Sequence, residues 1–197
     1  FHETKNIACG EGGALLLNDP SLLERAEILR EKGTNRSKFF RGQIAKYNWV
    51  DIGSSYLPSE VNAAFLLGQL EASGAIQSRR KHIWETYRAE LLAWAASNGA
   101  CLPFVPEHCE HPYHMFYLLM PTLERRQAFI AHMKQRGITT PFHYVPLHSS
   151  PMGQRLGGRP GDCPVTERIS DQLVRLPLFN TMSDEETGQV IDAALAF

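Results

Sequence analysis

The sequence predicts an α/β fold in which a long helix separates two parts of the chain. Apolar side chains recur at every third or fourth position over residues 59–98, and this period predicts a helix of about 40 residues. The pattern after it favours strands over 101–105 and 115–120, a helix over 123–135, a strand over 138–145, and helices over 166–174 and 183–196. This order of elements is typical of a small α/β domain. The prediction therefore gives three parts, residues 1–58, 59–98 and 99–197.

The first part has one short regular stretch and one long irregular one. Residues 14–18 are predicted as a buried strand, and Asp19 or Ser21 is suited to cap a helix that runs to about Lys32, before Gly33 ends it. Residues 34–58 have no sustained period, although they carry five aromatic side chains. An irregular stretch of about 25 residues is unusual in a compact domain and is more often functional or interfacial.

The helix predicted over 59–98 is longer than an ordinary globular helix. Either the Ser-Gly pair at 73–74 breaks it, or it bridges two domains. We prefer the bridging helix.

The composition is that of a globular chain without a strong charge. The 197 residues include 20 basic and 21 acidic side chains, a formal net charge of −1, so no bulk field attracts nucleic acid or an anionic membrane. No apolar run approaches the ~18 residues of a membrane span and no signal segment opens the chain, so the expected location is the cytoplasm. The chain starts at Phe1 rather than Met, and we expect it to be a piece of a longer protein.

The four cysteines are widely spaced and include no Cys-x-x-Cys pair. They are Cys9, Cys101, Cys109 and Cys163, in a chain long enough to fold without disulfides, so we expect reduced thiols.

Lys5 is the first candidate functional residue. It lies between short polar residues, and a glycine-rich run at 10–13 and an apolar run at 14–17 follow it. This pattern indicates a connection between two buried strands, where burial can lower the pKa of an amine and make it a Schiff-base nucleophile. The alternative is a solvated lysine beside a hairpin turn, which spacing alone favours because most lysines are exposed. The glycine run fits a tight turn better than a phosphate-binding loop, since its spacing matches neither known phosphate motif.

Five segments of the chain resemble one family in the order in which they occur. Residues 1–6 followed by 10–14 resemble the lysine segment of the pyridoxal-phosphate sugar aminotransferases, the DegT/StrS group within the aspartate-aminotransferase fold. The other segments are 30–36, 52–59, 143–148 and 176–179. The resemblance implies the C-terminal part of a fold type I fold: a remnant of the large cofactor-binding domain at 1–58, a bridging helix at 59–98, and the small α/β domain at 99–197.

The resemblance also implies roles for individual residues. Lys5 would form a Schiff base with pyridoxal phosphate and then serve as the general acid and base. Ser55 stands where the family has an asparagine that reaches the cofactor phosphate of the neighbouring subunit of a homodimer, and a hydroxyl makes that contact more weakly. The alternative is that the side chains of Ser54 and Ser55 only form hydrogen bonds with the backbone of the turn. Arg30 and Arg36 can offer planar forks to a phosphate or carboxylate, or be ordinary surface arginines.

The segment 143–148 lies on the sugar side of the family's site. His143, Tyr144 and His148 are therefore the expected substrate contacts, and the alternative is that the two histidines are structural residues. On an alternating strand, His143 and Val145 would point one way and Tyr144 the other.

The implied reaction is the transfer of an amino group from L-glutamate to C4 of a nucleotide-linked 4-keto-6-deoxyhexose, in the biosynthesis of a cell-surface polysaccharide. Because the family's pyridine-nitrogen aspartate, stacking aromatic residue and phosphate-binding helix would all precede Phe1, we expect the isolated chain to be inactive. The alternatives are a C3-aminating relative and a non-catalytic domain that self-associates. A sugar dehydratase is disfavoured because dehydratases of this group carry histidine in place of Lys5.

A cluster of metal-binding residue types lies at 108–114. His108, Cys109, His111 and His114 suit zinc, but Pro106 and Pro112 interrupt them and their spacing fits no zinc finger. We therefore predict a polar loop and no metal. Residues 153–164, rich in glycine and proline, are predicted as a mobile surface loop.

Overall fold

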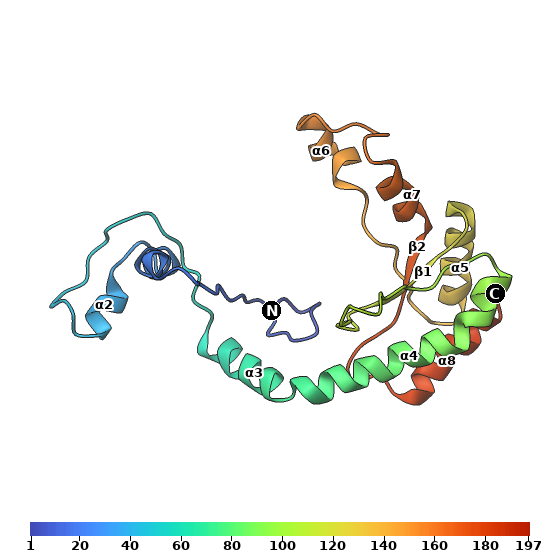
Figure 1. The fold of residues 1–197 in the computed structure, drawn as a ribbon, viewed down its shortest axis with the longest axis horizontal. Helices are drawn as coiled ribbons and strands as arrows, with labels where there is room; N and C mark the ends of the chain where they lie inside the picture. The colour runs from blue at the N-terminus through green and yellow to red at the C-terminus, as the bar shows by residue number, and fades with distance from the viewer. The chain divides into compact units, whose positions relative to one another are not determined.

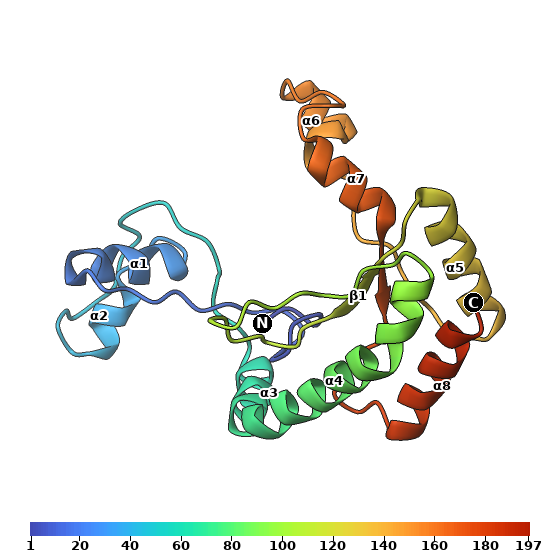
Figure 2. The same cartoon turned by 45° about the vertical axis from the view of Figure 1, so that its right-hand side comes forward.

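The computed structural model describes residues 1–197 as two compact units, Phe1–Ser73 and Gly74–Phe197. Figure 1 labels most of the helices and both strands, and Figure 2 labels α1. No helix combines the length and the apolar character that a membrane span requires.

Short helices and backbone pairing, rather than a sheet, hold the first unit together. A 3-10 helix (Pro20–Leu22) leads into α1 (Leu23–Arg30), and α2 (Arg36–Phe40) and α3 (Glu60–Glu71) follow. The Asp19 carboxylate accepts a hydrogen bond from the N–H of Ser21 at 2.9 Å, which confirms the predicted cap.

The irregular stretch after α1 folds back on the end of that helix. The carbonyl of Gly33 accepts hydrogen bonds from the N–H groups of Val50 at 2.8 Å and Asp51 at 3.0 Å. Gly33 has φ +73°, and a Cβ there would lie 1.7 Å from the carbonyl oxygen of Asp51. A Cβ on Gly53 would lie 2.0 Å from the nitrogen of Gly33. The two backbone segments therefore approach each other at a distance that only glycine permits.

The strand predicted over 14–18 is wrong. These residues form no strand, and Leu15 and Leu16 are 74% and 84% exposed. A strand needs a neighbouring strand for its N–H and C=O groups, and the chain pairs none with this run.

The second unit contains one small sheet. Its helices are α4 (Ser73–Ser97), α5 (Leu123–Gln135), α6 (Pro151–Arg155), α7 (Pro164–Gln172) and α8 (Asp184–Leu195), with a 3-10 turn at Leu147–Ser149. Strands β1 (Phe116–Leu119) and β2 (Leu173–Leu176) pair antiparallel, with Phe116 opposite Leu176 and Leu119 opposite Leu173. Figure 2 shows α7 running directly into β2.

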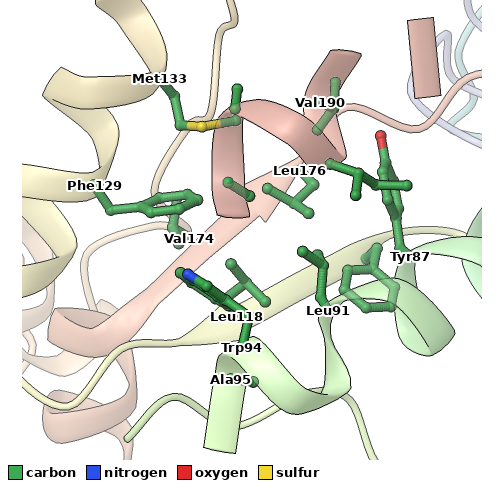
Figure 3. Close-up of a cluster of buried hydrophobic side chains, with 14 of the residues drawn as sticks. Tyr87, Leu91, Trp94, Ala95, Leu118, Phe129, Met133, Val174, Leu176 and Val190 are labelled. Carbon is green, nitrogen blue, oxygen red and sulfur yellow. The ribbon is translucent and has the colours of Figure 1, made fainter. Parts of the chain in front are cut away.

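The core of the second unit combines side chains from α4, β1, α5, β2 and α8. Figure 3 shows the cluster, in which Phe129 and Met133 of α5 face Val174 of β2, with Tyr87 and Leu91 contributed by α4. All five side chains are fully buried. Burying a side chain of this size contributes about 1.5–3 kcal/mol, so this cluster is the main stabilising feature of the unit.

Several boundaries differ from the prediction. The helix predicted over 59–98 is divided into two helices, because α3 ends at Glu71 with Ala72 as its C-cap and α4 begins at Ser73. The strands predicted over 101–105 and 138–145 are reduced to single bridges, Cys101 with Leu119 and Phe142 with Val174. Each of these runs contains a proline, which cannot donate to a strand ladder. Part of the predicted loop at 153–164 belongs to α6.

Candidate functional site

Lys5 lies in a tight reversal of the chain over residues 1–12. Its N–H donates to the carbonyl of His2 at 2.9 Å, and the N–H of Glu3 donates to the carbonyl of Gly10 at 2.8 Å. Gly10 adopts φ +82° where the chain returns. The glycine run thus forms the turn that the sequence predicts.

The Lys5 side chain is exposed, so the prediction that two buried strands flank it is wrong. The physical reason is the missing strand at 14–18, without which nothing covers the turn. None of the ion pairs in the chain engages Lys5. A primary amine on a flexible stem, with no carboxylate holding it, can bond a carbonyl carbon once it is deprotonated. The residues of this turn therefore fit a carbonyl-bearing cofactor such as pyridoxal phosphate.

Helix α3 anchors the turn that carries Lys5. The carbonyl of Glu11 accepts hydrogen bonds from the side-chain amide of Asn62 at 3.4 Å and from the thiol of Cys9 at 3.3 Å. His2 Nε2 lies 3.4 Å from the carboxylate of Glu11. Asn62 was not predicted from the sequence, because no local pattern relates it to a turn 51 residues away.

Arg30 and Ser55 come together at the end of α1. The N–H of Tyr56 donates to the carbonyl of Arg30 at 3.1 Å, and Glu31 and Ser55 form an antiparallel bridge. The side chains of Arg30 and Ser55 are exposed, and the Ser55 hydroxyl has no partner in the chain. A free hydroxyl and a free guanidinium can both donate hydrogen bonds to a phosphate.

Arg36, in contrast, is already engaged. Its guanidinium donates to Glu31 at 2.8 Å and lies 4.9 Å from the ring centroid of Phe40. Glu31 is only 7% exposed, so this pair satisfies a buried carboxylate. The nearby Arg41 grips Glu27 with two hydrogen bonds of 2.7 and 2.8 Å, which hold the pKa of the Glu27 carboxyl below its usual range. Arg36 is thus not available as an anion-binding residue.

In the second unit, His143 and Tyr144 are neighbours rather than residues on opposite faces of a strand. Their ring centroids lie 4.9 Å apart, so the predicted alternation is wrong. The segment departs from strand geometry because it makes only one bridge, at Phe142. His143 Nδ1 is buried without a hydrogen-bond partner, and burial, followed by the charge of Arg175, lowers the pKa of the imidazole.

His148 is held by an acidic partner that the sequence analysis missed. Its Nε2 lies 2.7 Å from Oε1 of Glu167 in α7. The same oxygen accepts a hydrogen bond from the N–H of Gly161 at 2.6 Å. The hydrogen bond from His148, followed by that from Gly161, lowers the pKa of the Glu167 carboxyl. The two residues are 19 positions apart across an irregular segment, so no sequence period relates them.

An open groove of about 750 Å³ lies beside this segment, between α5 and α7. Phe142, Val145 and Glu167 line it together with Arg126 and Lys134 of α5, whereas His143, Tyr144 and His148 do not. The predicted residues thus fall into two sets. Lys5, Arg30 and Ser55 belong to the first unit, and the 143–148 segment belongs to the second.

The polar loop at 108–114 packs against an aromatic ring. The ring centroid of His111 lies 5.0 Å from that of Trp84 and 4.9 Å from that of Tyr113. Burial lowers the pKa of the His111 imidazole. The chain contains no group of three or more histidine, cysteine, aspartate or glutamate side chains arranged to hold a metal ion.

Comparison with known proteins identifies one family. The model of the DegT/DnrJ/EryC1/StrS aminotransferase family matches residues 1–195. The erythromycin biosynthesis sensory transduction protein EryC1 of Saccharopolyspora erythraea is 31% identical over 193 residues, which cover 97% of this chain and 49% of that protein. The dTDP-3-amino-3,4,6-trideoxy-alpha-D-glucose transaminase of Streptomyces venezuelae is 30% identical over 195 residues, covering 98% of this chain and 48% of that protein.

A solved structure supports the same relationship. The aminotransferase TlmJ from Streptoalloteichus hindustanus superposes with a TM-score of 0.81 at 27% identity, over 96% of this chain and 48% of TlmJ. The predicted fold type I architecture is thereby confirmed. The chain spans about half the length of the curated relatives it matches.

Proposed function

Because the chain belongs to the DegT/DnrJ/EryC1/StrS aminotransferase family, we propose that it forms part of a pyridoxal-phosphate-dependent enzyme that aminates a nucleotide-linked keto-sugar. Lys5 carries this proposal. It is an exposed amine with no ion-pair partner, on a hydrogen-bonded turn, in a sequence context that resembles the family's lysine segment.

Lys5 performs two tasks in this proposal. Its Nζ would hold the cofactor covalently, and as a free amine the same Nζ would accept and return a proton as the general acid and base. Pyridoxal phosphate, when bound, supplies the electron sink for the charge that develops when that proton leaves. The turn fixes the backbone of Lys5 through the hydrogen bond to His2, while the flexible stem lets the amine move between the two tasks.

Ser55 and Arg30 are proposed to hold anionic groups. The Ser55 hydroxyl can donate to a phosphate oxygen of the cofactor, and by the family resemblance it would do so across the interface of a homodimer. The backbone pairing at the end of α1 presents the two residues together, and both side chains are exposed. A hydroxyl is a weaker phosphate donor than a charged group, so Ser55 would contribute less than Lys5 to holding the cofactor.

The sugar side is assigned to the 143–148 segment. His143, Tyr144 and His148 offer ring nitrogens and a phenol, which are suited to the hydroxyl groups of a sugar. The orphaned Nδ1 of His143 and the anchored ring of His148 support this assignment.

We propose L-glutamate as the amino donor and C4 of a dTDP-4-keto-6-deoxyhexose as the acceptor. The basis for this choice is that residues 39–43 and 51–57 most resemble the dTDP-4-amino-4,6-dideoxygalactose transaminase of enterobacterial common antigen synthesis. The expected location of the enzyme is the cytoplasm. C3 amination is the second candidate, because the relative from Streptomyces venezuelae is named as a 3-amino-sugar transaminase.

A product assay separates the two candidates. The full-length protein is incubated with L-glutamate and dTDP-4-keto-6-deoxyglucose, and the products are identified by mass spectrometry and NMR. A 4-amino product supports the proposal. No product with this sugar, together with amination of a 3-keto isomer, would reassign the position while leaving the aminotransferase class intact.

A further inference from the structure

Glu167 joins three segments of the second unit through one oxygen atom. Its Oε1 lies 2.7 Å from His148 Nε2 and accepts a hydrogen bond from the N–H of Gly161 at 2.6 Å. The His148 side chain is only 15% exposed, so water competes weakly for its ring, whereas the Glu167 side chain is 31% exposed. Glu167 therefore fixes the ring of His148 to the first turn of α7.

Helix α7 also contacts the 143–148 segment at Tyr144. Ser170 follows Glu167 by three residues, a spacing that places two side chains on one helix face. Its hydroxyl donates to the carbonyl of Tyr144 at 2.9 Å. Helix α7 thus binds the substrate-side segment at Tyr144 and at His148.

The identity of the partner decides which nitrogen of His148 carries a proton. An ionised carboxylate can only accept hydrogen bonds, so Nε2 must be the protonated nitrogen. Glu167 is ionised because its two donors stabilise the charged form, which lowers the pKa of the carboxyl. When the ring is neutral, Nδ1 then has a lone pair, and no group of the chain donates to it.

We propose that Glu167 is a positioning residue that holds His148 as the Nε2–H tautomer, so that Nδ1 accepts a hydrogen bond from a sugar hydroxyl. The choice of a sugar as the ligand rests on the proposed function. The tautomer itself rests only on the contact between His148 and Glu167.

The tautomer can be measured directly in the 197-residue chain. Two-bond proton–nitrogen NMR correlations of ¹⁵N-labelled chain distinguish a protonated from an unprotonated ring nitrogen, and His148→Gln identifies the resonance. We expect Nε2–H to exceed Nδ1–H by about tenfold or more in the neutral ring, because a hydrogen bond to a charged group contributes about 1.5–3 kcal/mol.

Glu167→Gln removes the charge while keeping the size of the side chain. It should bring the two tautomers to comparable populations. The matched control is Glu90→Gln, at an exposed carboxylate of α4 that makes no ion pair, and it should leave the tautomer unchanged. A wild-type ring protonated at Nδ1, or a tautomer unchanged by Glu167→Gln, overturns the proposal. The wild-type spectrum decides the question even where the variant fails to fold.

The kinetic arm uses the full-length enzyme. Glu167→Gln should raise KM for the keto-sugar about tenfold, while the half-reaction with the amino donor alone keeps its rate. A general structural defect would slow both half-reactions, and that result contradicts a positioning role. If the full-length protein aminates no sugar, the proposed function fails, while the NMR result still decides the role of Glu167.

Discussion

Replacing Tyr87 by phenylalanine isolates one buried hydrogen bond of the second unit. Tyr87 is fully buried on α4, and its hydroxyl donates to the carbonyl of Pro177 at 2.8 Å. Phenylalanine keeps the ring contact with Phe116, whose centroid lies 5.3 Å away. The variant therefore loses the hydrogen bond and leaves a carbonyl without its donor, at a cost of about 1–3 kcal/mol.

Urea denaturation of the chain measures this cost. With a slope of about 2 kcal/mol per molar urea, the midpoint should fall by about 0.5–1.5 M. Tyr117→Phe is the matched control, because Tyr117 is only half-buried on β1 and its phenol has no partner in the chain, and it should change stability by less than about 0.5 kcal/mol. Equal midpoints for the two variants would refute the reasoning.

Comparing the wild type with Tyr87→Phe also tests how the stability depends on pH. Burial raises the pKa of the Tyr87 phenol above its ordinary value. A raised pKa means that the contribution of Tyr87 to stability is complete below about pH 10 and is lost as the pH rises further, because only the unfolded phenol ionises there. Above pH 10 the free energy of unfolding should thus fall more steeply for the wild type than for Tyr87→Phe. Parallel curves would contradict this.

Three further substitutions test local features of the fold. Gly53→Ala places a Cβ 2.0 Å from the nitrogen of Gly33, so hydrogen exchange should accelerate around residue 54. The first unit should lose about 2 kcal/mol or more of its free energy of unfolding. In Gly68→Ala the Cβ meets open space, so this substitution should stabilise α3 by about 0.5–1 kcal/mol. Ser183→Ala removes the side-chain oxygen that accepts a hydrogen bond from the N–H of Glu186 at the start of α8, and it should lower the stability by about 0.5–2 kcal/mol in thermal unfolding. An unchanged melting temperature would mean that this side-chain cap does not contribute.

Sequence alone predicted the elements whose signals are local. Helix α5 spans Leu123–Gln135, as predicted, because Thr122 caps it and its apolar residues keep the helical period. Helix α8 lies within the predicted range 183–196, and Ser183 forms a capping box with Glu186 at its start. Elements that depend on distant partners were not predictable. The apolar run at 14–17 resembles a strand, yet no strand of the chain pairs with it.

The same distinction between local signals and distant partners applies to the residues of the candidate site. Lys5 was identified from the residues around it, and the turn at Gly10 formed as predicted. The exposure of the Lys5 side chain was not predicted, because it depends on what packs over the turn. The partnership of His148 with Glu167 depends on how the irregular segment between them folds, and no periodic pattern encodes that path.

The most direct test of the central claim asks which lysine of the full-length protein carries the cofactor. The protein is loaded with pyridoxal phosphate and reduced with borohydride, and its peptides are sequenced by mass spectrometry. The account predicts a cofactor adduct on Lys5, and loss of both the adduct and the visible absorbance band in Lys5→Ala. An adduct on another lysine, or a Lys5→Ala protein that keeps the band, would contradict it.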